Sequence, residues 1–103
     1  MKTYAVDRNK WQRHSLFEQM GNIGSEVGRT FHAELRGEDY REVMARALDL
    51  FDATVSNPKL SAPRRREILR AKEEYLDSIS KKDKQAGVEN YFMQFAVAAR
   101  ITR

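Results

Sequence analysis

Residues 15–36 read SLFEQMGNIGSEVGRTFHAELR, and this stretch decides the fold. It carries large apolar side chains at three- and four-residue steps, the period of one helix face: Leu16, Met20, Ile23, Val27 and Phe31. Gly21, Gly24 and Gly28 recur at the same steps beside that face, and we call them the glycine shoulder. Glycine inside a helix costs about 1 kcal/mol relative to alanine. We therefore expect a second helix, from this chain or another copy, to pack closely on the shoulder.

The limits of this first helix are marked by capping signals. Ser15 followed by Glu18 is a capping box, and Gly37 suits the position that follows a helix end. The sequence therefore predicts a helix over 15–36, with a start near Asp7 as the alternative. The glycine spacing is not that of a dinucleotide- or phosphate-binding loop. A kink at the glycines is the alternative to close packing.

Three further amphipathic helices are expected after an N-terminal arm over 1–14. They cover residues 39–55, 63–80 and 88–101, with a polar connection over 81–87. On the helix over 63–80 the expected inward side chains are those of Ile68, Leu69, Tyr75, Leu76 and Ile79. Short connections make successive helices antiparallel neighbours. The sequence thus predicts an all-α fold, a single up-and-down four-helix bundle over 1–103 whose first helix bears the glycine shoulder.

Composition indicates a folded cytoplasmic protein. The 103 residues are 41% hydrophobic and 33% charged, with two prolines and no cysteine. The absence of cysteine excludes a disulfide framework and thiolate metal or redox sites. The N-terminus has no apolar segment typical of a signal peptide, and no run approaches the roughly 20 apolar residues of a membrane span. We expect neither membrane association nor a small-molecule substrate.

The net charge of +4 lies in the second half of the chain. Residues 1–60 carry nine basic and nine acidic side chains, whereas residues 61–103 carry ten and six. The basic residues of the second half form two clusters: Arg64, Arg65, Arg66 and Arg70, and then Lys81, Lys82 and Lys84. The arginine cluster is the candidate for contact with the phosphate backbone of RNA or DNA. The alternative is a solvated face neutralised by acidic neighbours, including a pair between Arg70 and Glu74.

Catalytic and metal sites are not indicated. His14 and His32 lie about 27 Å apart along a continuous helix, and no HxxxH or ExxH spacing is present. No serine–histidine–aspartate or cysteine–histidine set can be assembled. We predict no catalytic residue, no metal and no cofactor.

Two family resemblances carry functional expectations. Arg8-Asn9 followed by His14 resembles the Arg-Asn-x4-His motif of the HEPN ribonucleases, which are small helical bundles. That resemblance implies RNA cleavage by Arg8 and His14 at a dimer interface. A solvated arm is the alternative.

The second resemblance concerns residues 22–29, NIGSEVGR, followed by residues 40–48, YREVMARAL. They resemble the junction of two helices in the small four-helix-bundle proteins encoded in intervening sequences of ribosomal RNA genes. This family usually has Asn-Ile-Ala-Glu-Gly, and here one extra residue precedes Glu26. The resemblance implies a ring-like homo-oligomer with a basic surface, as in the related accessory proteins of retroelements.

The sequence therefore favours a non-enzymatic protein that acts by association. We expect it to form a homo-oligomer through an apolar or close-packed helix face and to contact RNA or DNA through the arginine cluster. A HEPN-like ribonuclease and a protein–protein adaptor or regulator are the alternatives.

Overall fold

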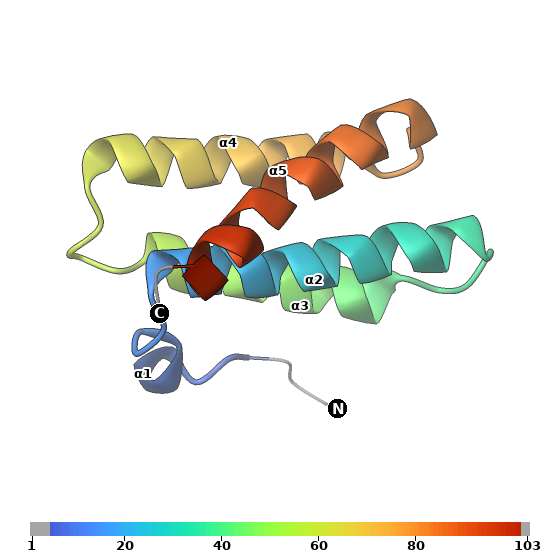
Figure 1. The fold of residues 1–103 in the computed structure, drawn as a ribbon. Helices are drawn as coiled ribbons and strands as arrows, with labels where there is room; N and C mark the ends of the chain where they lie inside the picture. Colours follow the sequence, from blue (N-terminus) through green and yellow to red (C-terminus); the bar gives the residue numbers. More distant parts are fainter. Residues whose placement is uncertain (1–4, 102–103) are drawn as a thin grey trace.

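The computed structural model describes residues 5–101, which form five helices and no strand (Figure 1). The helices are α1 (Arg8–Trp11), α2 (Leu16–Leu35), α3 (Arg41–Val55), α4 (Ala62–Ser78) and α5 (Lys82–Ile101). The long helix α2 contacts both α3 and α5, and α4 joins α3 to α5. The all-α expectation is confirmed for the described residues.

The predicted caps of α2 are both present. Ser15 accepts a hydrogen bond from the Glu18 backbone N–H, and the Glu18 side chain accepts one from the Ser15 N–H. At the other end Gly37 adopts φ +73°, and the N–H of Glu38 bonds to the carbonyl of Ala33 at 2.8 Å. This is a Schellman motif, in which glycine takes the left-handed conformation at no steric cost.

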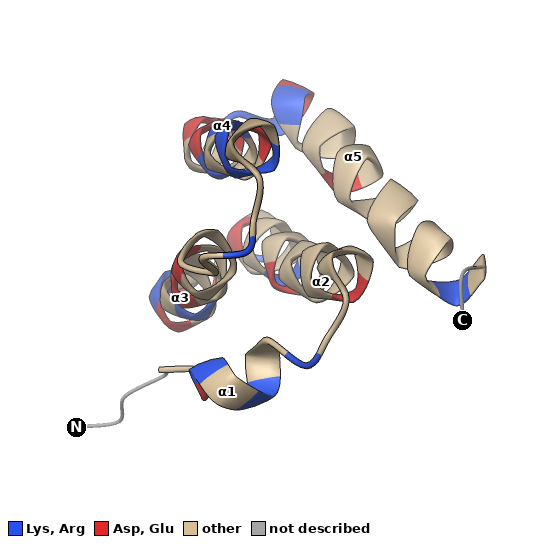
Figure 2. Cartoon of the chain, turned by 90° about the vertical axis from the view of Figure 1, so that its left-hand side faces the viewer, with Lys and Arg blue, Asp and Glu red and all other residues tan. Residues whose placement is uncertain are grey.

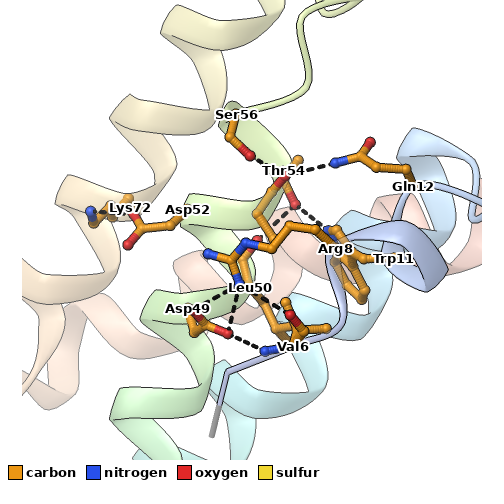
Figure 3. A network of polar contacts seen from close by, with 11 residues as sticks. Val6, Arg8, Trp11, Gln12, Asp49, Leu50, Asp52, Thr54, Ser56 and Lys72 are labelled. Atoms are coloured by element: carbon orange, nitrogen blue, oxygen red, sulfur yellow. Dashed lines mark hydrogen bonds and ion pairs between the residues drawn. The ribbon is translucent and has the colours of Figure 1, made fainter.

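The arm over 1–14 contains the short helix α1, which side chains attach to α3 (Figure 3). Asp7 caps α1 and Ser15 caps α2. The two residues that the sequence offered as alternative starts of one helix therefore each begin a separate helix. The Trp11 ring is buried, and its Nε1 donates to Thr54 Oγ1 at 2.9 Å. A four-residue helix is not stable alone, so these contacts hold the arm. Residues 1–4 of the expected arm lie outside the described residues.

The glycine shoulder lies partly under α5. A methyl group on Gly21 would stand 3.2 Å from Ala96 Cα, and one on Gly24 would stand 2.6 Å from Phe92 Cβ. A methyl group on Gly28 would meet nothing within 4 Å. Close helix packing within the chain therefore occurs at Gly21 and Gly24. At Gly28 no helix of this chain packs on the shoulder, and close packing there against another copy stays a prediction.

Two further expectations are corrected by the structure. The buried face of α4 consists of Ile68, Ala71, Tyr75 and Ser78, whereas Leu69 and Leu76 are each 41% exposed. The last helix begins at Lys82 rather than residue 88, so most of the expected polar connection is helical. The chain turns instead at Ser80, which has φ +67°.

The core contains one hydrogen-bonded polar pair that joins α2 to α4. Thr30 Oγ1 donates its only hydrogen to the Glu26 carbonyl at 2.9 Å, so at 2.8 Å it accepts from the Tyr75 hydroxyl. The Tyr75 ring is fully buried and lies between Phe31 and Phe51. Burial disfavours the tyrosinate and raises the pKa of Tyr75 to about 12.

The raised pKa of Tyr75 predicts a loss of stability at alkaline pH. Tyrosine in an unfolded chain has a pKa of about 10, so the folded protein holds this proton more tightly. The resulting stabilisation is complete below about pH 10 and falls as the pH rises toward 12. Urea unfolding at several pH values should show a smaller alkaline decline for Tyr75→Phe than for the wild type. Equal declines would contradict the assignment.

Candidate nucleic-acid interface

Arg64 lies in the first turn of α4 and is partly neutralised there. Ser61 caps this helix by accepting from the Arg64 N–H at 3.3 Å. The Arg64 guanidinium pairs with Glu67 Oε1 at 3.0 Å, and both side chains are substantially exposed. An exposed pair of this kind contributes at most about 1 kcal/mol. Arg64 can therefore exchange Glu67 for an external anion at little cost.

The Arg65 side chain binds backbone carbonyls at the end of α3. Its Nε donates to the Val55 carbonyl at 3.0 Å, and its Nη2 donates to the Asn57 carbonyl at 2.9 Å. These carbonyls lie at and beyond the C-terminus of α3, where backbone acceptors lack partners within the helix. Arg65 thus holds the α3–α4 connection and is not directed at solvent.

The side chains of Arg66 and Arg70 make no hydrogen bond or ion pair with any of residues 5–101. The expected pair between Arg70 and Glu74 is not formed. Both arginines are exposed along one rim of a groove between α4 and α5, whose volume is about 840 Å³. The groove has an apolar floor formed by Ala71, Val88, Tyr91 and Phe92. Three basic and three acidic residues line it, so the groove itself favours neither sign of ligand charge.

Other segments bring further basic residues to the end of the molecule where α4 begins. Arg65 links the start of α4 to the end of α3 through the Val55 carbonyl. Gln12, just after α1, donates from Nε2 to the Ala53 carbonyl of α3 at 2.9 Å. The rings of Phe17 in α2 and Phe95 in α5 lie 6.2 Å apart. Residues 7–19, 52–68 and 95–101 therefore meet at one end, which we call the basic end. Figure 2 views this end, with basic segments on α1, on its link to α2, on the α3–α4 loop and at the C-terminus of α5.

The charge of the described chain is unevenly distributed between the two ends. The three segments of the basic end carry eight Lys and Arg residues against four Asp and Glu residues. The remaining described residues carry nine against eleven. The exposed cations of the basic end are Arg8, Lys10, Arg13, Lys59, Arg64, Arg66 and Arg100, of which Arg8 and Arg64 each pair with a carboxylate. Sequence reasoning found the arginines of α4 and missed the others, because they come from the arm, from the α3–α4 loop and from the end of α5.

In the lysine cluster at the other end, two of the three lysines share one carboxylate. Lys81 and Lys84 both donate to the Asp77 carboxylate at 2.7 Å. These two hydrogen bonds hold the pKa of Asp77 at about 2. Asp77 thus offsets part of the charge of this cluster, within a region where acidic residues outnumber basic ones, whereas the basic end has an excess of cations.

The residues of the ribonuclease motif bind different partners. Arg8 Nη1 pairs with both carboxylate oxygens of Asp49 at 3.0 and 3.1 Å (Figure 3), so it is held on α3. The His14 ring lies edge-on to Trp11 with centroids 5.9 Å apart, and its Nδ1 stands 4.0 Å from Glu18. No group of three or more His, Asp or Glu among residues 5–101 is arranged to hold a metal ion.

Comparison of this chain with protein-family models, with curated proteins and with solved structures finds no match. The resemblance to the intervening-sequence proteins thus depends on the quoted residues alone. Within the described part of the chain, no helix combines the length and apolar character needed to cross a bilayer.

Proposed function

We propose that this protein is a non-enzymatic, cytoplasmic binding protein whose basic end contacts the phosphate backbone of RNA or DNA. The observation that carries the proposal is the excess of cations at that end, set against an excess of acidic residues elsewhere in the described chain. We interpret the four long helices as an up-and-down bundle that opens between α4 and α5.

The chemistry of the basic end favours phosphate over bases. Most of its cations are arginines, whose planar guanidinium suits phosphate oxygens. The tryptophan at this end is buried, so it offers no ring for stacking on bases. Contacts of this kind position a protein on nucleic acid without reading its sequence. We therefore expect binding that depends on salt and little on sequence.

The test is a titration of fluorescently labelled single-stranded RNA and duplex DNA by anisotropy at several salt concentrations. The variant Lys59→Glu/Arg66→Glu reverses two exposed cations of the basic end. Each phosphate contact removed should lower the slope of log K against log salt by about 0.9 for duplex DNA and about 0.7 for a single strand. Glutamate near the start of α4 suits the helix dipole, so the variant should remain folded.

A matched control at the opposite end separates location from net charge. Lys81→Glu/Lys82→Glu makes the same change in formal charge, and we expect it to retain most of the affinity. Equal losses of nucleic-acid affinity in the two variants would overturn the proposal. So would the absence of binding by the wild type at low salt. Equal binding to anionic lipid vesicles would also overturn it. Cleavage of RNA that His14→Ala abolishes would favour the ribonuclease alternative, and binding only to a protein would favour the adaptor.

A further inference from the structure

The outer face of α5 is uncharged over residues 90–99 and exposes a stripe of apolar side chains beside the polar Asn90 and Gln94. Residues 90–99 include no charged side chain on any face of this helix. Met93 is 58% exposed, Val97 38% and Ile101 76%, and steps of four residues place them along one face. An adjacent side of α5 already packs on α2 through Phe92 and Ala96. Figure 2 shows the C-terminal half of α5 without charge until the basic segment at its C-terminus, whereas α3 and α4 bear charges along their lengths.

Opposite charges stand at the two ends of this apolar stripe. Glu89 precedes Met93 by four residues, and Arg100 follows it by seven, so all three lie on nearly the same side of α5. Neither Glu89 nor Arg100 forms an ion pair with another residue of the described chain. The rise along the helix separates the two charges by about 16 Å.

We propose that a second copy of this chain covers the stripe, with the two α5 helices antiparallel about a two-fold axis level with residue 95. Met93 then faces the partner's Val97, and Glu89 faces the partner's Arg100, twice in each dimer. Such a contact is self-complementary, as two-fold symmetry requires. A parallel pairing would instead place like charges together at both ends. The charge order along this face therefore selects a second copy and the antiparallel direction.

This pairing is independent of the proposed binding to nucleic acid. Because the paired helices run in opposite directions, the two basic ends would lie at opposite poles of the dimer. Each basic end would keep the exposed cations of α4 and of the α3–α4 loop free for a separate segment of polyanion.

The first test is the mass of the purified full chain by size exclusion with light scattering over a range of concentrations. The wild type should approach twice its chain mass of 12.0 kDa. Val97→Glu places a charge in the stripe and should give a monomer. Leu35→Glu is the matched control, because Leu35 is also exposed, at 65%, but lies at the end of α2. A monomeric wild type, or a dimer that survives Val97→Glu, would overturn the proposal.

Charge reversal tests the direction of the pairing. Glu89→Arg and Arg100→Glu each replace two attractions between the copies by two repulsions. Each should therefore raise the dissociation constant of the dimer about tenfold at low salt. The double variant restores opposite charges across the interface and should recover the affinity of the wild type. A dimer that Val97→Glu abolishes but neither single reversal weakens would overturn the antiparallel arrangement. Loss of nucleic-acid binding with an intact dimer would affect the proposed function alone.

Discussion

Trp11→Ala is expected to lower the free energy of unfolding by about 3–5 kcal/mol, the range for removing a large buried aromatic side chain. A domain of this size is usually stable by about 5–15 kcal/mol. The change would therefore remove a large part of the stability and could unfold the chain at 37 °C. The magnitude follows from where the ring lies: Trp11 is 95% buried between the arm and the bundle, although it belongs to a helix of four residues.

Trp11 supports the arm through several contacts at once. Its ring nitrogen donates to Thr54, its backbone carbonyl accepts from Gln19 Nε2 at 2.9 Å, and its neighbour Gln12 bonds to the backbone of α3. Without the ring, the remaining polar contacts must hold α1 against its loss of conformational entropy on folding. We expect the arm to detach, which would expose the apolar side chains beneath it.

Urea unfolding followed by circular dichroism measures this effect, and Trp11→Phe separates its two causes. Phenylalanine keeps most of the apolar contact but cannot donate to Thr54, whose hydroxyl still donates to the Leu50 carbonyl at 2.8 Å. The loss for Trp11→Phe should therefore be near 1 kcal/mol, the usual net contribution of one hydrogen bond. A similar small loss for Trp11→Ala would show that the arm contributes little to stability.

Local signals in the sequence were sufficient for the limits of α2. The Ser15 capping box and Gly37 depend only on neighbours in the chain, and the structure contains both. The start of α5 could not be placed in this way. Its first turns are polar and include the exposed Gly87, so they lack the apolar period by which the helix was recognised.

Faces and surfaces that depend on packing were harder to predict. On α4 the apolar residues surround much of the helix, and contact with α2, α3 and α5 selects the face with Ile68 and Tyr75 rather than Leu69. The basic end was only partly visible, because no sequence pattern joins Arg13 or Lys59 to the arginines of α4. The neutralisation of Lys84 likewise depends on Asp77, seven residues away across a turn.

Substitutions in the glycine shoulder should have opposite effects on stability, although each adds the same methyl group. Gly24→Ala would place Cβ 2.6 Å from Phe92 Cβ, an atom fixed to the backbone of α5. The two helices must therefore move apart, and overpacking of this kind costs about 1–3 kcal/mol. Gly28→Ala meets no atom within 4 Å, so it should gain up to about 1 kcal/mol from helix propensity.

Thermal unfolding of the three alanine variants measures this order directly. In a domain of this size 1 kcal/mol shifts the melting temperature by about 4–8 °C. Gly28→Ala should melt above the wild type and Gly24→Ala below it. Gly21→Ala should fall between them, because its methyl group would stand 3.2 Å from Ala96 Cα and needs a smaller shift of α5. A Gly24→Ala variant as stable as Gly28→Ala would show that α5 does not pack on α2 at this distance, and the placement of the outer face of α5 would fail with it.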